Sequence, residues 1–141
     1  RYGGWPACGE IDVMENRGNY PAVVQGTIHY ADANGKHLQS TELFTFPVNN
    51  GATNFHTYTL DWTTNAISWS VDGQLYEKQT NWSTVKADYP APFNQPFYII
   101  MNLAVGGIYG GDPNTNTVFP GEMQVDYIRV YDNMTTNRFG D

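Results

Sequence analysis

Three acidic side chains that could do chemistry lie within the stretch GEIDVME at residues 9–15, namely Glu10, Asp12 and Glu15. They alternate with apolar residues that favour β-strands, and a strand sends successive side chains to opposite faces. Glu10 and Asp12 would therefore share one face, whereas Glu15 would point to the other. A β-bulge, most easily at Val13 and Met14, would bring Glu15 back to the face of Glu10. We expect such a bulge.

Two glutamates on one strand face, four effective positions apart, suit a particular acid–base chemistry. Their Cα atoms would be roughly 13 Å apart at about 3.3 Å per residue. Side chains that lean toward each other would bring the carboxyl groups to about 5–6 Å, close to the separation used by retaining glycosidases and below that of inverting ones. The spacing therefore favours a retaining sugar hydrolase.

Two other interpretations of these carboxylates stay open at this point. A solvent-facing acidic strand would need no function, but acidic residues are depleted in strands and like charges on one face repel each other. A cation site is the second alternative, because calcium binds clustered carboxylates. A bulged strand is nevertheless a poor match for the loop that usually wraps this ion.

The rest of the chain consists of short strand patterns separated by turn signals, without a helical period of useful length. The strand that contains His29 places this residue on one face with Gln25 and Thr27. A hairpin turn is expected at Asp72-Gly73. We expect strands over residues 22–30, 40–46, 56–62, 66–72 and 74–79.

Two further segments complete the predicted fold. Residues 97–105 are an almost continuous apolar run, which predicts a central strand covered on both sides. Residues 122–131 predict a final strand, and loops are expected at 80–95 and 106–121. The chain therefore predicts one all-β domain, an antiparallel β-sandwich over residues 1–141.

Composition narrows the classes of partner. The net charge of −7 argues against nucleic acid, whose phosphates would be repelled. Aromatic residues make up 15% of the chain, which fits flat surfaces for pyranose rings. No apolar run approaches membrane-spanning length, so no membrane partner is expected. The single Cys8 lacks a local His or basic neighbour and predicts a packed side chain rather than a nucleophile.

Several motifs together point to one family. They are WPACGEIDVME at residues 5–15, GTIHY at 26–30, TLDWT at 59–63, the segment 96–107 and VDYIRVY at 125–131. With them the chain resembles glycoside hydrolase family 16 over essentially its whole length, and most of all the laminarinase-type endo-β-1,3-glucanases. The E-x-D-x-x-E spacing is similar to the bulged branch of laminarinases, agarases and carrageenases. The unbulged E-x-D-x-E spacing, which this chain does not have, is typical of bacterial lichenases, so a strict lichenase is not expected.

This resemblance implies a concanavalin-like jelly roll and endo-hydrolysis with retention. Glu10 would be the nucleophile, Glu15 the general acid/base, and Asp12 the residue between them that tunes their protonation. No cofactor is implied for catalysis. Complete domains of the family are longer, and only nine residues precede Glu10 here. We therefore expect an excerpt that lacks the amino-terminal strands, and an isolated fragment without activity.

Other residues are assigned by the resemblance and by their place on the predicted strands. Trp62 and Trp69 lie on apolar strand faces and are expected in the core. For His29 the alternative is a satisfied structural histidine, and for Asn102 an amide hydrogen-bonded in the core. The predicted sugar-binding residues are Trp5, His29, Asn102 and Trp82.

Asp126 shares its predicted strand face with Ile128 and Val130, where an unpaired carboxylate would be costly. The resemblance implies that Asp126 helps to hold a structural calcium away from the cleft, with most other ligands from the missing segment. Residues 81–83 and 133–135 fit the N-glycosylation pattern.

The leading hypothesis is a secreted endo-β-1,3-glucanase that acts on laminarin-like or mixed-linkage β-glucans and is a monomer at full length. One alternative is a glucan-recognition protein without catalysis. Such proteins usually lack one or both catalytic glutamates, and both are present here. Another alternative is an agarase or carrageenase, although the seven Lys and Arg show no cluster that would contact sulfate.

Overall fold

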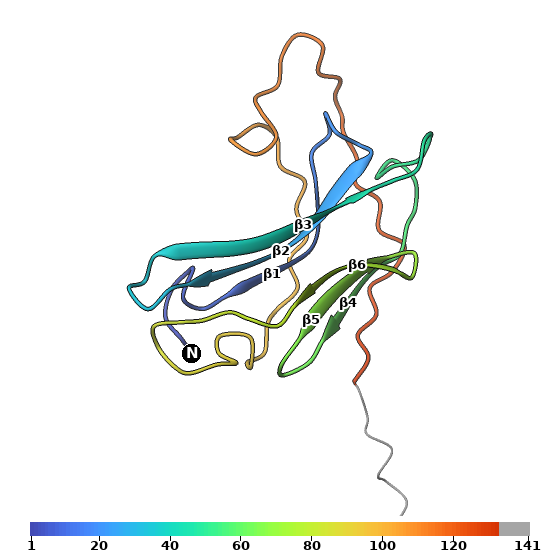
Figure 1. Ribbon diagram of the computed structural model, residues 1–141. Helices are drawn as coiled ribbons and strands as arrows, with labels where there is room; N and C mark the ends of the chain where they lie inside the picture. Colours follow the sequence, from blue (N-terminus) through green and yellow to red (C-terminus); the bar gives the residue numbers. More distant parts are fainter. Residues whose placement is uncertain (133–141) are drawn as a thin grey trace, which may run out of the picture.

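The computed structural model describes residues 1–132, which form two three-stranded antiparallel sheets that face each other (Figure 1). No helix occurs among these residues, which confirms the predicted all-β architecture for the described part. The predicted glycosylation sequence at 133–135 lies outside it. The first sheet contains β1 (Glu10–Asn16), β2 (Val23–Ala31) and β3 (His37–Thr45), and the second contains β4 (Tyr58–Trp62), β5 (Ile67–Val71) and β6 (Gln74–Gln79), each in chain order.

The central strand of the first sheet, β2, has two chemically different faces. Val24 and Ile28 are 1% and 0% exposed and belong to the core between the sheets. The opposite face carries Gln25, Thr27 and His29, as the alternation predicted. Because β2 pairs with both β1 and β3, this polar face extends across all three strands of the sheet.

Trp69 of β5 links the core to the first strand. It is completely buried, as predicted, and its indole Nε1 donates a hydrogen bond of 2.9 Å to the main-chain oxygen of Asp12. Gly26 allows the two sheets to approach at this point, because a Cβ there would lie 2.5 Å from Trp69 Cδ1. The second sheet therefore holds β1 at the residue where its pairing with β2 changes register.

The turn between β5 and β6 is the predicted hairpin at Asp72-Gly73, with φ values of 50° and 81° that fit a two-residue loop. Asp72 also accepts hydrogen bonds from the Thr57 amide and from His56 Nδ1, at 2.9 and 2.7 Å. These contacts hold residues 56–57 outside the ladder, so β4 begins at Tyr58 rather than at residue 56.

Two of the predicted strands are wrong. Residues 97–105 and 122–131, in orange and red in Figure 1, run as extended chain without strand pairing in the described part. Phe97 packs against the core, but the other side chains of both segments are exposed, with Ile100 at 70% and Val130 at 82%. A strand requires a neighbour that takes up its backbone hydrogen bonds, and within residues 1–132 neither segment has one. The apolar pattern alone could not supply that neighbour.

Trp62 also differs from expectation. It is 37% exposed rather than a core residue, because it lies at the end of β4, where its indole Nε1 donates 2.9 Å to the main-chain oxygen of Phe93. The described part of the chain contains no helix of the length and apolar character that a membrane crossing requires.

Candidate active site

A bulge in β1 places Glu10, Asp12 and Glu15 on one face of the first sheet. In the pairing with β2, Glu10 lies opposite His29, Asp12 opposite Thr27 and Glu15 opposite Gln25, with the register shift between Asp12 and Glu15. Paired residues of antiparallel strands project to the same side.

The partners of the three carboxylates on β2, at positions 25, 27 and 29, are spaced two residues apart and so share one face. The extra residue is absorbed at Val13 and Met14, which are both exposed. The predicted bulge and the four-position spacing of the glutamates are therefore confirmed.

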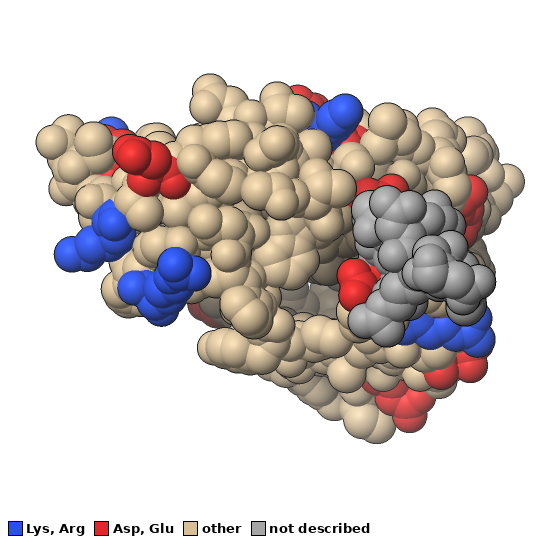
Figure 2. Space-filling model, turned by 90° about the horizontal axis from the view of Figure 1, so that it is seen from below, with Lys and Arg blue, Asp and Glu red and all other residues tan. Residues whose placement is uncertain are grey.

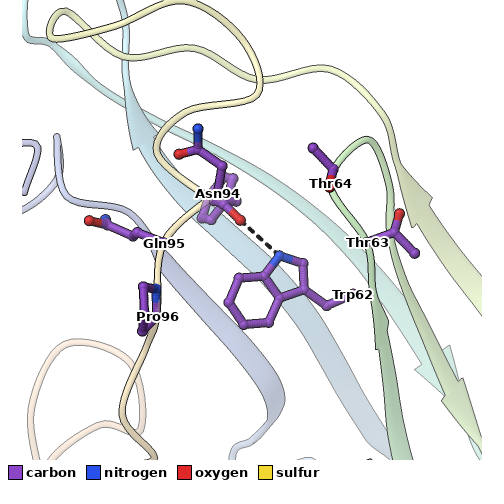
Figure 3. Close-up of a pocket in the computed structure, with 7 residues that line it drawn as sticks. Trp62, Thr63, Thr64, Asn94, Gln95 and Pro96 are labelled. Carbon is purple, nitrogen blue, oxygen red and sulfur yellow. Dashed lines mark hydrogen bonds between the residues drawn. The ribbon is translucent and has the colours of Figure 1, made fainter. Parts of the chain in front are cut away.

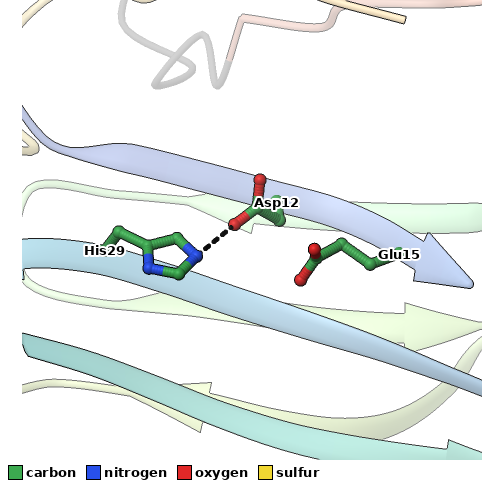
Figure 4. Close-up of side chains that lie close together, drawn as sticks. All are labelled: Asp12, Glu15 and His29. Atoms are coloured by element: carbon green, nitrogen blue, oxygen red, sulfur yellow. Dashed lines mark ion pairs between the residues drawn. The ribbon is translucent and has the colours of Figure 1, made fainter. Parts of the chain in front are cut away.

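Asp12 lies at the centre of this face and pairs with a histidine. His29 Nε2 is 3.2 Å from the Asp12 carboxylate, and Figure 4 shows Glu15 directed toward this pair. Burial raises the pKa of Asp12, the contact with His29 opposes this rise, and the charges of Glu10 and Glu15 add to it. The same contact raises the pKa of His29. Asp12 and His29 thus respond to each other and to both glutamates.

Glu10 is held by a tryptophan that precedes its strand. Trp5 is 56% exposed, and its indole Nε1 donates a hydrogen bond of 2.5 Å to Glu10 Oε2. The Trp5 ring also lies 4.6 Å from the ring of His37 on β3 and 6.1 Å from that of His29, measured between centroids. The structure therefore places Trp5 and His29 beside the carboxylates, while their contact with sugar stays a prediction.

Glu15 receives two hydrogen bonds from β2. Gln25 Nε2 and Thr27 Oγ1 donate to its Oε2 at 3.0 and 2.9 Å. The three carboxylates consequently have different surroundings: an indole for Glu10, an imidazole for Asp12, and an amide with a hydroxyl for Glu15. The two glutamates thus have different hydrogen-bond donors, which suits two carboxyl groups with different roles in one reaction.

Two further residues near the carboxylates, His37 and Tyr109, could not be selected from local sequence patterns. His37 Nε2 is 2.8 Å from His29 Nδ1, a contact set by the pairing of β2 with β3. Burial and the nearby charge of Glu15 raise the pKa of Tyr109, and the Arg17 guanidinium lies 5.0 Å from its ring. The one available signal for Tyr109 was its position among the glycines of segment 106–111, three of which have positive φ.

Two predicted sugar-binding residues do not join this face. Trp82 is only 4% exposed, packs in the core and donates to the main-chain oxygen of Pro90 at 2.7 Å, so its predicted role as an outer sugar contact is corrected. The position of Trp82 in a predicted loop does not indicate that its ring packs in the core. Asn102 lies in the exposed segment 97–105, so the buried amide expected in a central strand does not occur there.

Asp126 is exposed and lies in the extended segment 122–131 rather than on a strand. Among residues 1–132, His, Cys, Asp and Glu side chains come together in threes only at Asp12, Glu15 and His29, whose ligand atoms lie within 4.8 Å of one another. The described residues therefore build no side-chain cluster around Asp126, and the structural calcium stays a prediction. The cluster that does exist has an imidazole already paired with a carboxylate, which suits proton chemistry better than an all-oxygen calcium site.

A separate hollow of about 510 Å³ opens between the end of β4 and the loop that follows β6 (Figure 3). None of the three carboxylates lines this hollow, so it is separate from the candidate active site. Its lining residues are Trp62, Thr63, Thr64, Phe93, Asn94, Gln95 and Pro96. On the face shown in Figure 2, Lys and Arg form separate small groups rather than a continuous basic patch.

The chain matches the glycosyl hydrolases family 16 over residues 3–129 and belongs to that family. It is 46% identical over 137 residues to glucan endo-1,3-beta-glucosidase A1 of Niallia circulans. This alignment covers 92% of this chain and 20% of that protein. It is 43% identical over 132 residues to a beta-glucanase of Rhodothermus marinus, with 90% and 46% covered.

Among solved structures, the endo-beta-1,3-glucanase of Pyrococcus furiosus superimposes with a TM-score of 0.67 at 36% identity. That alignment covers 83% of this chain and 45% of the other. The predicted family and its two-sheet antiparallel fold are thereby confirmed. The chain spans less than half the length of these three relatives.

Proposed function

We propose that the intact polypeptide is a retaining endo-β-1,3-glucanase that cleaves laminarin-like or mixed-linkage β-glucans. The observation that carries this proposal is the bulge that sets Glu10 and Glu15 four positions apart on one sheet face, with Asp12 between them. The names of its relatives support the choice of β-1,3-glucan. Because a glucan polymer is too large to enter a cell, the proposal includes a secreted enzyme that degrades polysaccharide outside the cell.

In the first step, a carboxylate oxygen of Glu10 attacks the anomeric carbon of the sugar. The bond from that carbon to the leaving oxygen breaks, and Glu15 gives its proton to this oxygen. The product is a glycosyl ester of Glu10 and a released sugar chain end. The Trp5 indole, which donates to Glu10, holds the attacking carboxylate in place.

In the second step, Glu15 takes a proton from water while the water oxygen attacks the anomeric carbon. The ester bond to Glu10 breaks, and the sugar leaves with its original configuration. Formation of the ester removes one negative charge from the face, which helps Glu15 to change from acid to base. Asp12 lies between the two glutamates on β1 and pairs with His29 on β2, so the charge of this pair acts on both glutamates.

A second candidate function is glucan recognition without catalysis. The presence of both Glu10 and Glu15, each with hydrogen-bond donors, favours the enzyme. Cleavage of sulfated galactans is a third candidate, which the low number of Lys and Arg, seven in the whole sequence, disfavours. Recognition without catalysis gives no reason for two glutamates to share one bulged strand.

The test is the product profile of the intact polypeptide on laminarin, lichenan and agarose, with proton NMR of the first anomer released. We expect a series of oligosaccharides from laminarin, released as the β-anomer. Glu10→Gln should abolish turnover and keep glycan binding, and azide should restore a β-glycosyl azide product to Glu15→Gln. An α-anomer, or turnover of agarose alone, would overturn the proposal.

A further inference from the structure

One oxygen of the Glu15 carboxylate is occupied by the protein. Gln25 Nε2 and Thr27 Oγ1 both donate to Oε2, at 3.0 and 2.9 Å, and both come from the face of β2 that faces the carboxylates. Both of these hydrogen bonds thus fall on the same oxygen of Glu15. An oxygen that already accepts two donors has no place for a proton of its own.

The donor from Thr27 has a fixed direction. When Glu15 is ionised its oxygens can only accept, so the single proton of the Thr27 hydroxyl is donated to Oε2. Thr27 Oγ1 then has to accept the hydrogen bond of 3.0 Å from Thr41 Oγ1 on β3. The result is a chain of hydroxyls that runs from Thr41 through Thr27 to Glu15.

The burial of Thr27 makes this chain of hydroxyls costly to break. Thr27 is 1% exposed, so water cannot easily replace either of its partners. A buried hydroxyl that lost its acceptor would be left unsatisfied at a cost. The pairing of Thr27 with both Asp12 on β1 and Thr41 on β3 also ties the hydroxyl to the centre of the sheet.

We propose that Thr27 is a positioning residue for the general acid: oriented by Thr41 and assisted by Gln25, it holds Glu15 Oε2, so the proton given to the leaving group sits on Oε1. This inference rests on the proposed role of Glu15 as acid/base. Loss of the Thr27 hydroxyl lets the carboxyl group rotate and place its proton on either oxygen. Proton transfer to the leaving oxygen then becomes slower, whereas attack by Glu10 does not change.

The experiment compares two substrates of the intact polypeptide through kcat/KM, which reports the first chemical step. Laminarin has a poor leaving group and needs the acid; a dinitrophenyl β-laminaribioside does not. Thr27→Val should lower kcat/KM on laminarin about tenfold to a hundredfold and leave the aryl glycoside nearly unchanged, because general acid catalysis contributes about 10²–10⁴-fold. Thr27→Ser, which keeps the hydroxyl, should recover most of the loss.

Controls separate positioning from folding. Thr45→Val, at an exposed position of β3, should match the wild type on both substrates. Equal losses of Thr27→Val on both substrates, or no loss on laminarin, would overturn the proposal. If Thr27→Val does not fold, Thr41→Val takes its place: a smaller loss confined to laminarin supports the chain of hydroxyls, and wild-type behaviour overturns it.

Glu15→Gln distinguishes the two levels of inference. If Glu15→Gln still cleaves laminarin at the wild-type rate, the proposed function fails. If Glu15→Gln loses laminarin cleavage and keeps the aryl glycoside while Thr27→Val behaves as the wild type, only the positioning role fails.

Discussion

A buried glutamate outside the active site should make stability depend on pH. Glu77 of β6 is 3% exposed between the sheets, and its Oε2 has no hydrogen-bond partner. Burial raises its pKa to about 7 from an ordinary 4.5, although Gln79 and the backbone of Glu42 donate to it. Between pH 4.5 and pH 7, Glu77 therefore keeps its proton in the folded state and has lost it in the unfolded state.

The size of the effect follows from that difference. About 2.5 pKa units at 1.36 kcal/mol each give about 3 kcal/mol, because proton binding and folding are linked. Glu77 is neutral in both states below pH 4.5, so the full stability is present there. As the pH rises from 4.5 through 7, the folded state must either bind a proton at Glu77 or bury its charge. The free energy of unfolding therefore falls, by about 3 kcal/mol in total.

Glu77→Gln removes the charge and keeps the shape. A buried amide has its own cost at every pH, so the informative quantity is how the difference in unfolding free energy between variant and wild type changes with pH. It should move in favour of the variant by about 3 kcal/mol between pH 4.5 and pH 8. Urea unfolding followed by tryptophan fluorescence, to which the buried Trp69 opposite Glu77 contributes, measures it.

The exposed Glu122 supplies a matched control, since Glu122→Gln removes a charge that is not buried and burial therefore adds no pH dependence to its difference from the wild type. A flat difference for Glu77→Gln as well, or one that moves in favour of the wild type as the pH rises, would refute this reasoning. The first result would mean that Glu77 ionises as easily in the folded state as in the unfolded state.

Gly26→Ala should destabilise the fold by about 1–3 kcal/mol, because the new Cβ would lie 2.5 Å from Trp69 Cδ1, and overpacked cores cost that much. Equilibrium unfolding checks this, and a loss under about 0.5 kcal/mol would show that the sheets separate freely. Asp12→Asn should lower the pKa of His29 toward 6.5, because its main raising contact disappears. An NMR titration of the imidazole that shows no change would contradict the Asp12–His29 pairing.

The local features of the site could be predicted because they depend on alternation within single strands. The spacing of Glu10 and Glu15 requires a bulge if both are to share a face, and the structure has it between Asp12 and Glu15. The alternation of β2 likewise placed His29 on the polar face. In both cases the sequence itself contains the period that determines the direction of the side chain.

Features that depend on distant neighbours could not be predicted. The apolar run at 97–105 predicted a strand, but strands exist only where another strand accepts their hydrogen bonds. Trp82 lies in a loop whose path alone decides that its ring enters the core. His37 reaches His29 through the register between two strands, which no local pattern of β3 specifies.

The assignment of Glu10 as the nucleophile can be tested on the covalent intermediate. A 2-deoxy-2-fluoro-β-laminaribiosyl fluoride should glycosylate the nucleophile of the intact polypeptide, with loss of fluoride, faster than water releases the sugar, so the adduct accumulates. Mass spectrometry of the digested protein should then find one fluorosugar on the peptide that contains residues 9–15, attached to Glu10. A label on Glu15 or elsewhere, or no adduct on a polypeptide that cleaves laminarin, would contradict the account.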